Sequence, residues 1–229
     1  MADGAPGGAA VLFDVDGTLL DTNYLHVTAW WNAFRERGHD IPCADIHRAI
    51  GLGSEDLINR VLGHPDPGAS QAHSRYIAPY LGRMRALPGA PDLITEVSRL
   101  GLRVVLATSA KDEEVELMLD ALGARDAVST VVSSGAVKQA KPAPDIVHEA
   151  LRQSGTDRSR AVMVGDTVWD VLAAGRAGVP CIGLLSGGIS AADLREAGAA
   201  ETYPDPAGLL DKLAASAIGP LMPGAGGSD

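Results

Sequence analysis

An apolar run that ends in two carboxylates opens the patterned part of the sequence: Val11-Leu12-Phe13-Asp14-Val15-Asp16-Gly17-Thr18-Leu19-Leu20-Asp21. The aliphatic and aromatic residues at its start predict a buried strand. Because alternate residues of an extended chain face the same side, Asp14 and Asp16 can converge on one point just beyond the end of that strand. A glycine turn that happens to carry aspartates is the alternative, and this segment alone leaves both interpretations open.

Similar short apolar runs recur along the chain, at residues 104–106, 131–132, 162–164 and 182–184. Each is separated from the next by a segment that can hold a helix. One such segment has the i, i+3, i+4, i+7 spacing of a helix face, with Val115, Met118, Leu119 and Leu122 before Gly123. Strands that alternate with helices favour an α/β fold with a doubly wound, Rossmann-like parallel sheet.

The segment 23–87 breaks this alternation, because it contains helical patterns and no convincing strand. It holds six of the nine aromatic residues and five of the six histidines. Trp30 and Phe34, spaced i, i+4, are predicted to pack in the interior of this segment. We therefore expect an α/β core built from residues 1–22 and 88–229, with a helical domain inserted at 23–87.

The charge and hydropathy patterns exclude several classes of protein. The chain has 29 acidic and 19 basic side chains, a formal net charge of −10, and it has no basic run. We therefore expect neither nucleic acid nor a membrane surface as a partner. The longest apolar stretches are of strand length, far short of the roughly 20 residues that span a bilayer. No secretory signal is visible, which makes cytoplasmic residence the default expectation.

The ends of the chain and its two cysteines are expected to carry no chemistry. The Gly-, Pro- and Ala-rich ends, residues 1–9 and 218–229, lack periodic apolar residues, so we expect them to be disordered. Cys43 and Cys181 lie far apart and have no CxxC partner, which predicts reduced and buried thiols.

Three further segments place polar side chains at predicted strand ends. Thr108-Ser109 follows the second apolar run, where its hydroxyls can bind a phosphate-sized anion or simply cap a helix. Lys141 precedes a proline-started helix that would hold it near the sheet edge, although chance placement is an alternative. Asp166 and Asp170 follow the fourth run. Because carboxylates packed together raise one another's pKa unless a cation neutralises them, these acids favour a hard divalent ion such as Mg²⁺.

Taken in order, these segments resemble the four motifs of the haloacid dehalogenase superfamily. The matching stretches are Asp14-Val15-Asp16-Gly17-Thr18, Thr108-Ser109, Lys141-Pro142 and Gly165-Asp166-Thr167-Val168-Trp169-Asp170. Each motif alone is weak to moderate, but four in the right order on strand ends are highly specific. The resemblance covers the chain from Val11 to Leu213, and the helical insert occupies the position of that superfamily's type 1 cap. Phosphoglycolate phosphatases and β-phosphoglucomutases are the similar members.

The resemblance implies a phosphatase that acts on a small phosphorylated metabolite. In such an enzyme Asp14 would attack phosphorus and become a transient aspartyl phosphate. Asp16 would protonate the leaving alcohol and then activate water to hydrolyse the intermediate. Lys141 would neutralise both the nucleophile and the phosphate.

The resemblance also implies ligands for Mg²⁺ and for the phosphate. The expected metal ligands are Asp14, the backbone carbonyl of Asp16, and Asp166, with Asp170 supporting them. Thr108 and Ser109 would hold the oxygens that are not transferred.

Three residues of the insert are candidates for contacts with the substrate. The turn that contains Gly51 and Gly53 is expected to face the site when the insert closes and to select the leaving group. His26 is expected either to orient Asp16 or to be an ordinary packed histidine.

Related chemistries are distinguished by particular residues. Members that displace halide usually lack the second aspartate, Asp16, so a dehalogenase is disfavoured. Phosphonoacetaldehyde hydrolases use a cap lysine, and residues 23–87 contain none.

A β-phosphoglucomutase-like isomerase remains an open alternative, because the run Asp21–His26 resembles the corresponding run of those enzymes. Residues 51–56 carry two acids where those enzymes carry an arginine, which favours a phosphatase. A phosphate-binding protein without catalysis is disfavoured, because neither aspartate of the first motif is missing.

Overall fold

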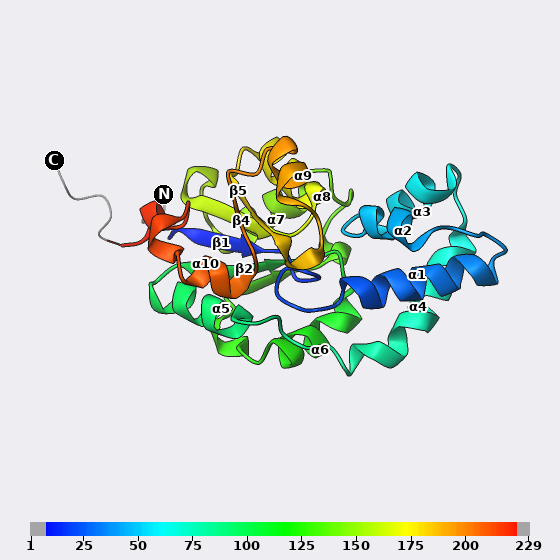
Figure 1. Cartoon of the computed structure of the whole chain (residues 1–229). Helices are drawn as coiled ribbons and strands as arrows, with labels where there is room; N and C mark the ends of the chain where they lie inside the picture. The colour runs from blue at the N-terminus through cyan, green and yellow to red at the C-terminus, as the bar shows by residue number, and fades with distance from the viewer. Residues whose placement is uncertain (1–7, 224–229) are drawn as a thin grey trace, which may run out of the picture.

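Six parallel strands form the centre of the computed structural model, which describes residues 8–223 (Figure 1). The strands are β1 (Ala10–Phe13), β2 (Arg103–Ala107), β3 (Thr130–Val132), β4 (Ala161–Gly165), β5 (Cys181–Leu184) and β6 (Glu201–Tyr203). Their order across the sheet is β3-β2-β1-β4-β5-β6. After β1, the chain thus adds β2 and β3 on one side of it and then β4, β5 and β6 on the other side. This confirms the doubly wound α/β fold predicted from the sequence.

Two layers of helices cover the sheet (Figure 1). One layer consists of α5 (Ala90–Arg99), α6 (Asp112–Leu122) and α10 (Pro206–Leu210), and the other of α7 (Asp145–Ser154), α8 (Val168–Ala177) and α9 (Ala191–Glu196). Val11 and Phe13 of β1 pack in the cluster that includes the first layer, whereas Ala10 and Leu12 pack in the cluster that includes the second. The strand is apolar without interruption because both of its faces are buried.

The predicted helix before Gly123 is present as α6. Met118, Leu119 and Leu122 are its buried residues, as the spacing predicted. Gly123 ends the helix with a φ of 70°, in the left-handed region that glycine adopts without a steric penalty.

The last strand and several short helices were not predicted. The three residues of β6 are only half-buried at the edge of the sheet, so they show no apolar run. The 3-10 turns are η1 (Arg125–Ala127), η2 (Ser134–Ala136), η3 (Arg158–Arg160), η4 (Leu185–Gly187), η5 (Leu213–Ala215) and η6 (Gly219–Leu221). Of these, η4 lies beside the candidate site described below.

Four helices occupy the segment between β1 and α5: α1 (Asn23–Glu36), α2 (Cys43–Ala49), α3 (Ser54–Leu62) and α4 (Pro67–Leu81). They lie beside one end of the core (Figure 1). Trp30 and Phe34 are buried among them with ring centroids 5.4 Å apart, which confirms their predicted packing. The two connections to the core run side by side, since the Asp21 amide donates to the Arg85 carbonyl and the Leu87 amide donates to the Leu19 carbonyl.

The expectation that residues 1–9 and 218–229 are disordered was wrong where the structure describes them. Ala9 is buried, and its carbonyl accepts a hydrogen bond from the Arg103 amide. Ile218 is fully buried in the cluster that includes α5 and α10. Gly219 and Pro220 directly follow Ile218 and concealed the apolar character of this segment, although Ile218, Leu221 and Met222 all pack against the core. Residues 1–7 and 224–229 lie outside the described part of the chain.

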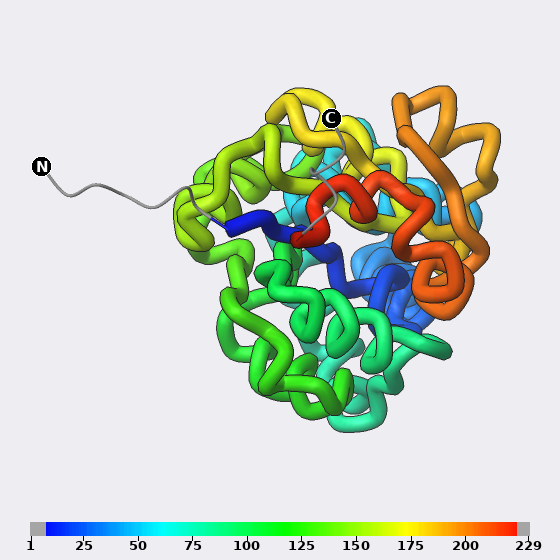
Figure 2. The backbone as a smooth tube through the Cα atoms, turned by 90° about the vertical axis from the view of Figure 1, so that its left-hand side faces the viewer, coloured from blue at the N-terminus to red at the C-terminus, as the bar shows by residue number. Residues whose placement is uncertain are grey.

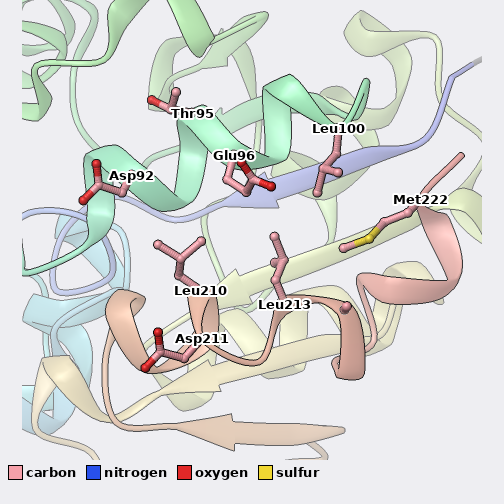
Figure 3. A pocket seen from close by; sticks show the side chains of 9 residues that line it. Asp92, Thr95, Glu96, Leu100, Leu210, Asp211, Leu213 and Met222 are labelled. Atoms are coloured by element: carbon pink, nitrogen blue, oxygen red, sulfur yellow. The ribbon is translucent and has the colours of Figure 1, made fainter.

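The C-terminal segments pack at the end of the core remote from α1–α4, close to the start of β1 in Figure 2. Between them and α5 lies a surface groove lined by Asp92, Thr95, Glu96, Leu100, Leu210, Asp211, Leu213, Ala214 and Met222 (Figure 3). None of the predicted site residues lines this groove.

Both cysteines are free thiols. Cys181 is buried in β5 as expected, but Cys43 is exposed, so the prediction was wrong for Cys43. It begins α2, the short second helix of the insert, where its side chain faces solvent. Among residues 8–223, no helix has the length and apolar character that crossing a membrane requires.

We expect Ile218→Ala to lower the free energy of unfolding by about 2–5 kcal/mol, because it leaves a cavity in a fully buried position. Urea denaturation measures the change. Leu117→Ala is the matched control, since Leu117 is 40% exposed and should change stability by no more than about 0.5 kcal/mol. Equal effects of the two substitutions would contradict the assignment of Ile218 to the core.

Candidate active site

Three carboxylates meet at the point where the strand order reverses. Asp14 directly follows β1, Asp166 follows β4, and Asp170 lies in the first turn of α8. One oxygen of each lies within 4.8 Å of the others, and all three side chains are buried. Because β1 and β4 are neighbours in register, with Phe13 beside Val164, residues 152 positions apart in sequence are adjacent here. Ligands of doubly wound sheets bind at this edge.

Lys141 is the cation that these carboxylates share. Its side chain is 1% exposed, and its Nζ forms ion pairs with Asp14 Oδ1 and, at 2.7 Å, with Asp170 Oδ1. The same Nζ lies 3.4 Å from the Ala107 carbonyl at the end of β2. Burial alone would lower the pKa of Lys141, but the charges of Asp14 and Asp170 raise it above its usual value, so the ammonium stays protonated.

One lysine does not balance three buried acids. Burial raises the pKa of Asp14 to about 7 against the lowering influence of Lys141, and the charges of Asp170 and Asp16 add to the rise. Burial, followed by the charges of Asp14 and Asp170, also raises the pKa of Asp166 well above its usual value. Buried carboxylate oxygens with elevated pKa values are suited to a hard divalent cation, so the donor set fits a metal ion.

Asp170 differs from the other two acids because its carboxylate also caps a helix. Oδ2 accepts hydrogen bonds from the Thr167 amide at 3.1 Å and from the Thr167 hydroxyl at 2.6 Å. The Asp170 amide donates to the same hydroxyl oxygen at 3.3 Å, which completes the capping box of α8. Oδ1 pairs with Lys141. Asp170 therefore holds Lys141 against Asp14. The oxygens of Asp14 and Asp166 each accept from one side chain, so each keeps a lone pair that a further ligand could use.

The carboxylate of Asp16 does not join this cluster, contrary to the expectation that the acids of the first motif converge on one point. It accepts a hydrogen bond from the Thr22 hydroxyl at 2.6 Å and lies 3.4 Å from His26 Nε2. The chain turns at Gly17, with a φ of 77°, so the strand geometry that would align Asp16 with Asp14 ends there. The Asp16 side chain consequently faces α1 and remains 19% exposed.

His26 lies between Asp16 and a second histidine. Its Nδ1 is 3.3 Å from Nε2 of His73 on α4, and the His73 ring stacks on Trp30 at 4.1 Å. Burial, together with the charge of His26, lowers the pKa of His73 to about 3, so His73 is neutral. The ring of His26 is thus held between the Asp16 carboxylate and the neutral ring of His73.

The charges of Asp16 and His26 shift each other's pKa. Burial alone would raise the pKa of Asp16, but the charge and hydrogen bond of His26, with the Thr22 hydroxyl, bring it below its usual value. Burial alone would lower the pKa of His26, but Asp16 raises it above its usual value. The pair therefore favours a carboxylate beside an imidazolium.

The loop between α2 and α3 touches the core segments around the cluster. The Ser109 hydroxyl lies 3.5 Å from the Gly51 carbonyl. A Cβ at Gly51 would lie 2.8 Å from the Thr167 hydroxyl, and one at Gly53 would lie 2.5 Å from Cβ of Ala140. The insert therefore packs down on the core, with glycines at the points of closest approach.

Thr108 lies at the end of β2 with its side chain 1% exposed. Its hydroxyl accepts a hydrogen bond from the Ala110 amide at 3.0 Å, which shapes the turn into α6. The turn follows the same edge of the sheet as Asp14, because β2 is the neighbour of β1. Thr108 and Lys141 are linked through adjoining backbone, since Lys141 approaches the carbonyl of the preceding residue, Ala107.

Four polar residues that contact the predicted site were not singled out from the sequence. The Thr18 hydroxyl donates to Asp166 Oδ1 at 2.9 Å, and Asn23 contacts the same carboxylate. Thr22 contacts Asp16, and His73 contacts His26. Thr18 could have been found, because it lies one turn beyond Asp14 in the quoted segment. Asn23 and His73 carried no signal, because their partners are 143 and 47 positions away.

Known proteins resemble this chain over most of its length. A family model described as haloacid dehalogenase-like hydrolase matches residues 9–178. The phosphoglycolate phosphatase of Caulobacter vibrioides is 32% identical over 184 residues, which is 76% of this chain and 77% of that protein. The chloroplastic protein SUPPRESSOR OF QUENCHING 1 of Arabidopsis thaliana is 31% identical over 233 residues, but this chain spans only 21% of its length.

Solved structures show the same fold. A hydrolase from Pseudomonas syringae, 32% identical, has a TM-score of 0.84, with 90% of this chain and 97% of that one covered. CbbY from Rhodobacter sphaeroides, crystallised in complex with xylulose-(1,5)bisphosphate, is 29% identical, with a TM-score of 0.72 over 88% of this chain and 96% of that one. With a family model that matches most of its residues, the chain belongs to the haloacid dehalogenase-like hydrolase family.

Proposed function

We propose that the protein is a Mg²⁺-dependent phosphatase that hydrolyses a small phosphomonoester through an aspartyl-phosphate intermediate. The observation that carries this proposal is the buried pair of Asp14 and Lys141 beside Asp166 at the switch point of the sheet. A carboxylate can attack an anionic phosphate only where positive charge offsets the repulsion. Membership of the family, whose similar members include phosphatases, supports the same reaction.

In the first half of the proposed reaction, an oxygen of Asp14 forms a bond to phosphorus and the bond from phosphorus to the leaving oxygen breaks. Asp16 receives a proton from the adjacent His26 imidazolium and donates it to that oxygen, so an alcohol departs, and His26 recovers a proton through Asp16 in the second half. In the second half, Asp16 takes a proton from water, whose oxygen bonds to phosphorus as the bond to Asp14 breaks. Inorganic phosphate leaves, and both aspartates return to their starting states.

The remaining residues bind and orient the reacting groups. Lys141 neutralises Asp14 and the incoming phosphate, while Thr108 and Ser109 would hold the oxygens that are not transferred. A Mg²⁺ bound by Asp14, Asp166 and the backbone carbonyl of Asp16 would offset the charge between the nucleophile and the phosphate.

The leaving group is proposed to lie on the side of the insert. There Thr22 and His26 fix the Asp16 carboxylate, and the loop with Gly51 and Gly53 closes over the core. An enclosed site of this kind admits small organophosphates and excludes macromolecules. Phosphoglycolate and sugar phosphates are the proposed substrate classes, supported by a phosphoglycolate phosphatase and a bisphosphate complex among the similar proteins.

We expect Asp14→Asn to reduce phosphate release from an aryl phosphate with Mg²⁺ by roughly 1000-fold or more, because it removes the nucleophile. A colorimetric phosphate assay at saturating substrate measures the loss, and circular dichroism checks that the variant is folded. Asp21→Asn is the matched control, since Asp21 is an exposed aspartate of the same segment. A folded Asp14→Asn variant whose turnover lies within about tenfold of the wild type, as the control's should, would contradict the covalent mechanism.

Lys141→Met is expected to destabilise the metal-free protein by about 3–5 kcal/mol, because it leaves buried carboxylates without their cation. Lys138→Met controls for the loss of a lysine from the same loop, since Lys138 is exposed. Urea denaturation of both variants measures the difference. A change in Lys141→Met as small as that in Lys138→Met would show that the buried ion pair does not stabilise the site.

The elevated pKa of Asp14 makes a prediction about pH. Its value of about 7 in the folded protein exceeds the usual aspartate value of 3.8, so the folded state holds this proton more tightly than the unfolded state does. The metal-free wild type should therefore lose stability relative to Asp14→Asn as the pH rises from about 4 to about 7. Thermal unfolding of both proteins in EDTA across this range measures the difference. A difference in stability that is independent of pH would contradict the buried, protonated Asp14.

A further inference from the structure

Asn23 connects the insert to the acidic cluster. It is the first residue of α1, and its side chain is 3% exposed. Its Nδ2 donates to Asp166 Oδ2 at 2.8 Å and to the Gly187 carbonyl in η4 at 3.2 Å. Both hydrogens of the amide are therefore used, and each binds a segment of the core that is distant in sequence.

The orientation of this amide is fixed by its partners. A carboxylate oxygen and a carbonyl oxygen are both acceptors, so an amide turned the other way would place its own oxygen against two acceptors. Two glycines also lie close to the contact between the Asn23 amide and the Asp166 carboxylate. A Cβ at Gly17 or at Gly187 would collide with both Asp166 Oδ2 and the Asn23 amide. The backbone on either side therefore leaves room for this contact and for no additional side chain.

The oxygen of the same amide has no partner. Asn23 Oδ1 is buried and accepts no hydrogen bond within the described part of the chain. A buried amide oxygen without a donor is unfavourable, so it calls for a hydrogen from water or from a ligand. Because the other end of the amide binds Asp166, this oxygen lies beside the residues that would hold the cation.

We propose that Asn23 is a positioning residue of the metal site. The Asn23 Nδ2 group orients the Asp166 carboxylate so that Asp166 Oδ1, which accepts from Thr18, faces the cluster. The amide oxygen of Asn23 accepts a hydrogen bond from a water bound to the cation. Partners of this kind orient the ligands of metal ions and raise metal affinity. The inference rests on the proposed function, because it assumes that Asp14 and Asp166 bind Mg²⁺.

This role makes the insert part of the metal site, although all of the proposed ligands belong to the core. Asn23 is carried by α1, so Asp166 keeps its amide partner only while the start of α1 stays docked at η4. A second contact docks the insert there without touching the acids, since Nε2 of His47 on α2 lies 2.8 Å from the Gly187 carbonyl. His47 therefore provides a control that separates docking of the insert from orientation of Asp166.

The test is titration of Mg²⁺ into the metal-free full-length protein by isothermal calorimetry. We expect Asn23→Ala to weaken Mg²⁺ binding by roughly 10- to 100-fold, and His47→Ala to leave it unchanged. In turnover assays, Asn23→Ala should raise the Mg²⁺ concentration required for half-maximal activity, while the substrate KM at saturating Mg²⁺ stays at the wild-type value. If circular dichroism shows that Asn23→Ala is unfolded, Asn23→Leu, which has nearly the same shape, replaces it.

Wild-type affinity in a folded Asn23 variant would overturn the role of Asn23 while leaving the proposed function intact. Equal weakening in Asn23→Ala and His47→Ala would also overturn it, because docking of the insert would then account for the effect. Absence of Mg²⁺ binding by the wild type would overturn this inference together with the proposed metal site.

Discussion

The ion pairs between Lys141 and two buried aspartates are the interaction on which the candidate site depends. Asp14 and Asp170 come from different segments, and the ammonium of Lys141 touches both in a position that is 1% exposed. The charge of Lys141 opposes the rise that burial imposes on the pKa of Asp14. Even with it, the pKa of Asp14 is raised to about 7, because burial outweighs the lysine. The site thus retains an excess of negative character that a divalent cation would offset.

The topology explains why these residues meet. β1 lies between β2 and β4, so the segments that follow these strands reach the same edge of the sheet. The capping box of α8 fixes Asp170, which in turn fixes Lys141. The insert closes this edge from the other side with α1, α4 and the loop around Gly51. The core thus supplies the charged cluster, whereas the insert adds His26 as a partner of Asp16 and Asn23 as a partner of Asp166.

The sequence was sufficient for features that depend on local pattern. Continuous apolar runs identified five strands, of which β1, β4 and β5 are buried along their whole length. The interruption of that rhythm identified the insert. β6 was missed because an edge strand of three half-buried residues lacks such a run. Ile218 was missed because the adjacent Gly219 and Pro220 suggested an unstructured end, although it is fully buried.

The candidate site was predicted in the same uneven way. The order of the motifs on strand ends identified Asp14, Lys141, Asp166 and Asp170, which the structure brings together. The expectation for the Asp16 carboxylate was wrong, because extended geometry ends at the turn through Gly17. His73 and Asn23 could not be predicted, since their partners depend on how α1 packs against α4 and η4. Long-range packing of this kind leaves no trace in the spacing of residues.

The central claim is that the carboxylate of Asp14 carries the phosphoryl group during turnover. Rapid acid quench of the wild-type enzyme with substrate and Mg²⁺, followed by peptide mass spectrometry, tests it most directly. We expect a transient phosphoryl group on Asp14 that appears before steady state and decays once substrate is exhausted. A phosphoryl group on a different residue, or turnover with no phosphorylated peptide at any quench time, would contradict the account.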